Sequence, residues 1–135
     1  MTTAKSERPW QATVVLFISL FMIIRVSAFS RIGALEPDEL FWLYPVTIDI
    51  LLAFCAPLIV FFLWKRFGLG VWAIAFSFHI IAFQDATVGI LFETMLPMTS
   101  QGTSLSGVVS LTVIALLSLV ALWLLSRKEV RDYYL

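Results

Sequence analysis

The chain has 135 residues, of which 61% are hydrophobic and 13% charged, and its formal net charge is zero. A soluble domain carries about 25% charged residues, and a small one buries a smaller fraction of its surface than a large one, so this composition excludes a soluble globular protein. A neutral chain has no bulk field to attract nucleic acid. The single cysteine excludes an internal disulfide. The sequence predicts an integral membrane protein whose surroundings are the lipid bilayer.

Four apolar segments are long enough to cross a bilayer, which takes about 20 residues of helix. They cover about residues 10–29, 40–64, 69–96 and 106–125. The connections between them are short and rich in turn-forming residues, which leaves no room for a domain outside the membrane. We therefore expect an all-α membrane protein with one domain, a four-transmembrane-helix up-and-down bundle.

Basic residues indicate how this bundle is oriented. They precede the first segment, separate the second from the third and follow the fourth: Lys5, Arg8, Lys65, Arg66, Arg127, Lys128 and Arg131. The first connection is mainly acidic and the third has no charge, so both termini are predicted to be cytoplasmic. The compact chain favours a prokaryotic plasma membrane. The first segment also resembles a signal peptide, but Arg25 inside it favours a retained helix.

Three of the ionisable residues within the predicted spans share a similar depth: Arg25, Asp49 and Asp85. At a rise of about 1.5 Å per residue, all three fall in the outer half of the membrane, on three different helices. An arginine between two aspartates is the simplest way to bury such groups. One arginine neutralises only one carboxylate, so the other must be protonated, solvated or matched by another cation. The cluster is either a structural clamp or a transport or binding site.

The third segment has a regular face of small and polar residues. Its members, spaced by four and three residues, are Ala75, His79, Ala82, Ala86, Gly89 and Glu93. This spacing places them on one side of a helix, and small residues there let membrane helices approach closely. We expect the third helix to be central and its polar residues to face the bundle interior.

The remaining polar residues of this segment have separate interpretations. Gln84 is expected to bond across to another helix, and Glu93 to lie hydrated at the outer rim. His79 is interpreted as a neutral imidazole bonded to a serine or threonine, with a proton relay and a haem or metal ligand as alternatives. Because the chain has one histidine, bis-histidine haem would need another subunit.

Two helices have features that bear on shape. Pro57 in the second span cannot donate a backbone hydrogen bond, so we expect a helix kink there. The kink would widen a cavity next to Asp49 or supply a backbone ligand for a cation, and the alternative is a tolerated bend that neighbouring helices repair. The fourth span has no ionisable residue and is expected to face lipid or another subunit.

These features leave three functions open. The first, which the convergent ionisable residues favour, is a small transporter or channel, expected to act as a homo-oligomer because four helices enclose little space. The second is a non-enzymatic accessory subunit of a larger membrane complex with other membrane subunits. The third is an enzyme acting on a lipid or isoprenoid. For that role, "LEPDELFW" is similar, over these few residues, to the acidic, proline-containing motif of membrane-bound carotenoid cyclases, but the wider pattern of that family is absent. No metal-binding motif occurs and no cofactor is specified.

Overall fold

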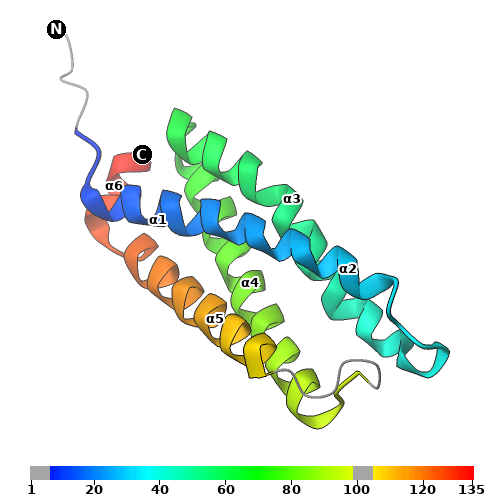
Figure 1. Ribbon diagram of the computed structural model, residues 1–135. Helices are drawn as coiled ribbons and strands as arrows, with labels where there is room; N and C mark the ends of the chain where they lie inside the picture. Colours follow the sequence, from blue (N-terminus) through cyan, green and yellow to red (C-terminus); the bar gives the residue numbers. More distant parts are fainter. Residues whose placement is uncertain (1–6, 99–104) are drawn as a thin grey trace, which may run out of the picture.

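Residues 7–98 and 105–135 are described by a computed structural model of the chain. All regular secondary structure in these residues is helical, and four helices are long and apolar enough to cross a membrane. These spans cover Trp10–Ile32, Pro37–Lys65, Leu69–Met95 and Leu105–Leu125. They run alternately up and down along one long axis (Figure 1). The predicted all-α four-helix membrane bundle is confirmed.

The first span is not a uniform α-helix. It consists of α1 (Trp10–Phe21), a 3₁₀ segment η1 (Met22–Ala28) and the short α2 (Phe29–Ile32). Stretches of 3₁₀ helix longer than about four residues are uncommon, because their hydrogen-bond geometry is poorer than that of an α-helix. Arg25 lies in the middle of this tightened segment, so the local backbone changes at the charged residue of the span.

The second span begins earlier than its hydropathy predicts. A 3₁₀ turn η2 (Pro37–Trp42) leads into α3 (Leu43–Lys65), and a reciprocal capping box between Glu36 and Glu39 closes its start. Glu39 is only 3% exposed, so one of the acidic residues in this connection is buried, while Asp38 remains exposed. Capping satisfies backbone N–H groups that a helix start would leave unpaired. The acidic connection therefore has a structural role in starting the second span.

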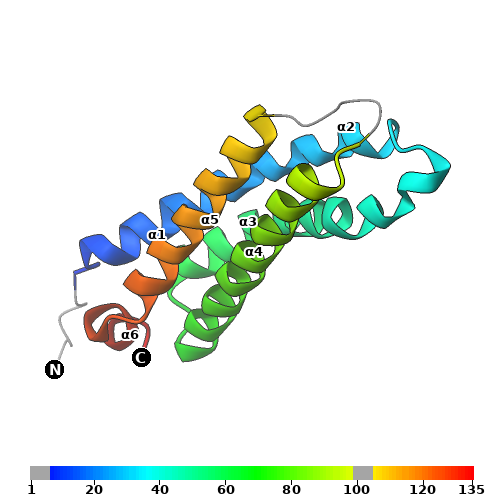
Figure 2. The same ribbon diagram turned by 90° about the horizontal axis from the view of Figure 1, so that it is seen from below.

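The third span, α4 (Leu69–Met95), is central, as its regular face predicted. All six members of that face are buried, and α4 packs between α3 and α5 (Leu105–Leu125). The two helices α4 and α5 lie side by side in both views (Figures 1 and 2). A Cβ atom added at Gly89 would come 3.0 Å from Leu111 Cδ1, so this glycine permits their close approach. The fourth span thus has one face on α4 and α1, rather than facing only lipid or a subunit.

A short helix, α6 (Lys128–Tyr134), folds back against the end of the bundle where the chain begins. The Arg66 Nε donates to the carbonyl of Tyr133, and the Tyr134 hydroxyl donates to the carbonyl of Leu63 at 3.5 Å. Arg8 Nη2 donates to the carbonyl of Trp64 at 2.9 Å. Burial raises the pKa of the Tyr134 hydroxyl to about 12. We call this the terminal end of the bundle.

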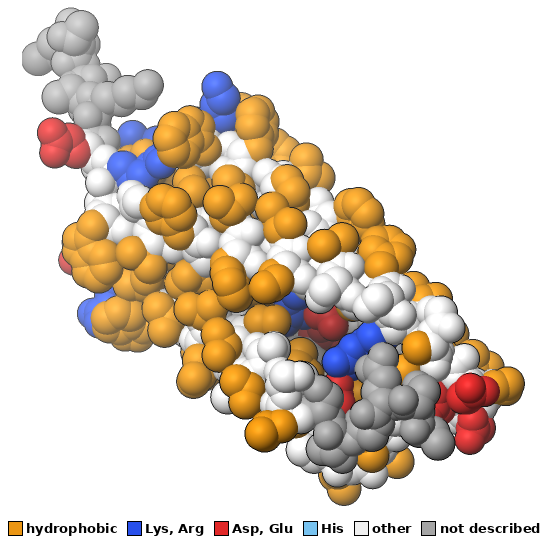
Figure 3. Space-filling model, viewed as in Figure 1, with side chains coloured by type: hydrophobic (Ala, Val, Ile, Leu, Met, Phe, Trp, Pro, Cys, Tyr) orange, Lys and Arg blue, Asp and Glu red, His pale blue; other side chains and the backbone are white. Residues whose placement is uncertain are grey.

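The opposite end, which we call the loop end, carries η2, the end of α4 and the start of α5 (Figure 1). Apolar side chains are spread along the length of the face in Figure 3, while blue and red charged atoms lie near the two ends and in one hollow between them. This surface suits a bilayer, in which apolar side chains contact lipid. That the terminal end is cytoplasmic stays a prediction.

Candidate functional site

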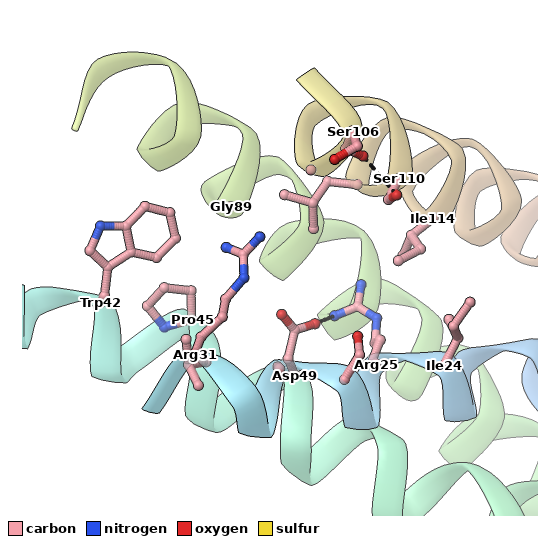
Figure 4. Close-up of a pocket in the computed structure, with 15 residues that line it drawn as sticks. Ile24, Arg25, Arg31, Trp42, Pro45, Asp49, Gly89, Ser106, Ser110 and Ile114 are labelled. Carbon is pink, nitrogen blue, oxygen red and sulfur yellow. Dashed lines mark hydrogen bonds and ion pairs between the residues drawn. The ribbon is translucent and has the colours of Figure 1, made fainter. Parts of the chain in front are cut away.

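The predicted ion pairs between Arg25 and two aspartates are confirmed. Arg25 Nη1 donates to Asp49 Oδ1 at 2.5 Å and to Asp85 Oδ2 at 2.7 Å. Its Nη2 donates to the backbone carbonyl of Ala82 at 2.8 Å. One guanidinium therefore joins η1 to both α3 and α4. Figure 4 shows Arg25 and Asp49 pointing toward one another between these helices. We call Arg25, Asp49 and Asp85 the ionic triad.

Burial makes the ionic triad energetically important. The side chain of Arg25 is 1% exposed and that of Asp85 3%, while Asp49 keeps 19%. Removing one partner of a buried ion pair costs about 3–5 kcal/mol, because the other charge is left without compensation. The triad therefore fixes the relative positions of three spans. Asp49 is its most accessible member.

The triad carries one carboxylate more than its arginine can balance. Asp49 and Asp85 both accept from Nη1 of the same arginine, which brings the two acids to one point in the bundle. Asp85 Oδ1 and Arg25 Nε are buried and have no hydrogen-bond partner among the described residues. A single proton on either carboxyl group would balance the charge of the triad and turn that group into a hydrogen-bond donor. The arrangement is chemically suited to hold and release a proton.

A cavity of about 270 Å³ lies beside the triad, toward the loop end. Residues from all four spans line it, and the polar ones are Arg25, Ser27, Arg31, Asp49, Ser106 and Ser110. Figure 4 shows Arg31 and Asp49 directed into the space in front of Gly89, with Trp42 to one side. The hollow with charged atoms in Figure 3 lies in the same half of the molecule. On the terminal side, no lining residue lies beyond Ile24 or Ile114.

A second ion pair, between Arg31 and Glu93, lies near the cavity. Arg31 Nη1 donates to Glu93 Oε1 at 2.5 Å, and the Arg31 guanidinium carbon lies 5.8 Å from the centre of a Trp42 ring. Glu93 is 3% exposed, so the expectation of a hydrated rim glutamate is wrong. The reason is close packing, since a Cβ added at Gly107 would come 3.1 Å from Glu93 Oε1. The sequence did not indicate Arg31 as a site residue, because it is a single basic residue in a connection that is otherwise acidic.

His79 is bonded to a serine, as its neutral interpretation predicted. Its Nε2 lies 3.0 Å from Ser19 Oγ, and Ser19 donates its hydroxyl proton to the carbonyl of Val15 at 2.8 Å. Because that hydroxyl has one proton, His79 Nε2 must be the donor in the pair. Nδ1 is buried with no partner among the described residues. His79 lies six residues from Asp85 along α4, on the terminal side of the triad, and is not a lining residue of the cavity.

Two residues expected near this site lie elsewhere. Gln84 is exposed and has no recorded hydrogen bond with the described residues. It follows Ala82 by two positions, a rotation of about 200° that turns it away from the buried face. Pro57 is also exposed and is not a lining residue of the cavity next to Asp49, and the kink at Pro57 stays a prediction. It lies eight residues beyond Asp49 on α3, or about 12 Å at 1.5 Å per residue. The proline that lines the cavity is Pro45.

Comparisons with known proteins do not assign the chain to a family. No family model, curated protein or solved structure matches the chain. Residues 7–98 and 105–135 contain no group of three or more His, Cys, Asp or Glu side chains that could hold a metal ion. The site is therefore interpreted from its own residues: a buried ionic triad with an excess carboxylate, beside a polar cavity within the membrane-spanning bundle.

Proposed function

We propose that the protein is a small membrane transporter that takes up a small polar solute in the cavity beside the ionic triad, together with a proton. The observation that carries the proposal is the excess carboxylate of the triad at the edge of the cavity, where Asp49 is partly exposed. Ionisable groups at membrane depth are costly and are commonly retained for solute or proton movement.

The shape of the cavity favours a transporter over an open channel. The residues that line it lie toward the loop end, and none lies beyond Ile24 or Ile114 on the terminal side. Beyond them the bundle contains the buried pair of His79 and Ser19 and apolar side chains. A solute would need a second conformation to leave toward the terminal end. We place the loop end outside and the terminal end in the cytoplasm of a prokaryotic cell, in keeping with the positive-inside rule.

The predicted homo-oligomer is part of this proposal, although the cavity lies within one chain. Large apolar side chains are exposed along all four helices. Several copies of the chain could pack against one another through these side chains, and each copy would keep its own cavity. The accessory-subunit alternative interprets the ionic triad as a clamp, since Arg25 already has three acceptors. The two interpretations differ in whether the triad moves protons.

Proton movement in liposomes separates them. Purified protein is reconstituted with an internal pH dye, and inward gradients of small organic acids, amines and sugars are applied in turn. We expect at least one class to drive proton uptake, and Asp49→Asn and Asp85→Asn each to reduce it at least tenfold. Asp38→Asn is the matched control, because Asp38 is an exposed acid at the loop end that does not line the cavity.

Fold is monitored by size-exclusion chromatography and circular dichroism for every variant. Triad variants that fold and still move protons at the wild-type rate would leave the triad as a clamp. No proton uptake with any solute class would contradict the proposal itself. In either case, co-purified subunits from native nanodiscs would be the next measurement.

A further inference from the structure

We propose that the solute is a small organic carboxylate with an apolar body, bound through Arg31 and the cavity wall. This inference rests on the proposed function, because it names the class of solute for the same cavity. The class of solute follows from three properties of the cavity. These are the charges of its lining residues, the hydrogen-bond donors of Arg31, and the size and apolar surface of the cavity.

The wall of the cavity is more cationic than the surrounding bundle. The charged residues among its lining are Arg25, Arg31 and Asp49, which gives two guanidinium groups and one carboxylate. Asp85 and Glu93 balance these arginines but are not lining residues. A solute in the cavity therefore meets two positive groups and one negative group at close range. The whole set of two arginines and three acids is negative by one charge until one acid is protonated, so an anion is favoured over a cation only through direct contact with a guanidinium group of the wall.

Arg31 has the donors that such an anion needs. Glu93 accepts from Nη1, and the Arg31 side chain forms no other hydrogen bond with the part of the chain that the structure describes. Its side chain is 24% exposed, and Figure 4 shows the guanidinium reaching into the cavity. The planar fork of arginine matches the two oxygens of a carboxylate. Arg25 is a weaker candidate for direct contact, because its Nη atoms are already used by Asp49, Asp85 and Ala82.

Size and apolar surface narrow the anion further. The cavity of about 270 Å³ holds about nine times the share of liquid volume of a water molecule, which suits a compact organic acid. The apolar part of the wall consists of aliphatic side chains and one indole ring: Ile24, Ala28, Trp42, Pro45, Val46, Leu111 and Ile114. A hydrated inorganic anion would have to give up its water to these side chains without compensation. An acid with a small aromatic or aliphatic body would bury apolar surface against them.

Charge balance connects this solute to the proton of the proposed function. Arg25 and Arg31 face three carboxylates in this region, those of Asp49, Asp85 and Glu93, so one proton makes the set neutral. An anion that enters brings a second negative charge, which a proton from the loop-end solution balances on a carboxyl oxygen of Asp49 or Asp85. Entry of the acid is then electroneutral, because one anion and one proton move together.

The test is equilibrium binding of radiolabelled benzoate to the intact protein in nanodiscs. We expect saturable binding that unlabelled benzoate removes completely, acetate removes only at higher concentration, and nitrate and tetramethylammonium do not remove. Arg31→Gln should weaken binding by about 10- to 100-fold, the usual loss for a hydrogen bond to a charged group. Arg127→Gln is the matched control, because Arg127 stacks on Trp123 outside the cavity.

A second variant separates ligand contact from a structural role of Arg31. Glu93→Gln breaks the same ion pair but leaves the guanidinium in place, so benzoate should bind at least as tightly as to the wild type. Equal weakening in both variants would overturn the assignment, as would nitrate competing as well as benzoate or tetramethylammonium being the bound ion. Benzoate binding without proton uptake would contradict the transporter alone, and amine-driven proton uptake without benzoate binding would contradict this inference alone.

Discussion

Replacing Arg25 by glutamine tests the energetic argument for the ionic triad most directly. The variant removes the cation between Asp49 and Asp85, both of which accept from it at 2.5–2.7 Å. An aspartic acid titrates in water near pH 3.9, so protonating one more carboxyl group at pH 7 costs about 4 kcal/mol. This agrees with the loss of about 3–5 kcal/mol for a broken buried ion pair. We expect the free energy of unfolding to fall by about 3–4 kcal/mol.

The pH dependence gives the sharper result. Protonation becomes easier as pH falls, by about 1.4 kcal/mol per pH unit for each carboxyl group, so the loss in the Arg25→Gln variant should shrink between pH 7 and pH 5. Unfolding by SDS in mixed micelles, followed by tryptophan fluorescence at both pH values, measures it. Adding Asp85→Asn should restore most of the stability, because one fewer carboxylate then lacks a cation. A loss below about 1 kcal/mol, or the same loss at both pH values, would refute the reasoning.

Three further predictions concern other parts of the bundle. Gly89→Leu should destabilise the protein by about 1–3 kcal/mol through overpacking against α5, while Gly70→Leu, at a position with nothing within 4 Å of an added Cβ, should not; SDS unfolding compares the pair. Ser19→Ala should cost about 1–3 kcal/mol in the same assay, because it leaves the buried Nε2 of His79 without its partner, whereas an unchanged stability would show that another group accepts this bond. The hydroxyl of Tyr134 has a pKa raised to about 12, so the unfolded state loses this proton first and stability should fall between about pH 10 and 12, by up to about 3 kcal/mol. The alkaline fall should be smaller in Tyr134→Phe, and an identical fall would contradict the assignment.

The spans and the triad could be predicted because both depend on regular helix geometry. Long apolar segments have one stable arrangement in a bilayer, and the rise per residue places charges at comparable depths. The depths of Arg25, Asp49 and Asp85 agreed within several ångströms on this basis, and the structure brings the three side chains into contact. The regular face of α4 was readable for the same reason, because its spacing repeats over its length.

Features that depend on contacts between distant parts of the chain could not be predicted. Arg31 and Glu93 are 62 positions apart, and nothing in either neighbourhood indicates the partner. The 3₁₀ segment around Arg25 has an ordinary apolar composition, so its tightening has no signal in the residues themselves. Gln84 was misplaced because its polarity was weighed above its angular position on the helix.

The helix α6 has a consequence for how the protein is made. Arg8 Nε donates to the Tyr133 hydroxyl at 3.4 Å although 125 positions separate them, so a helix synthesised after all four spans completes the packing at the start of α1. Until α6 has been synthesised, the start of α1 lacks these contacts, and the bundle is open at this end. A chain truncated before Lys128 would therefore still contain all four spans. The start of α1 would remain exposed in that chain, and quality-control proteases could bind and cleave it there.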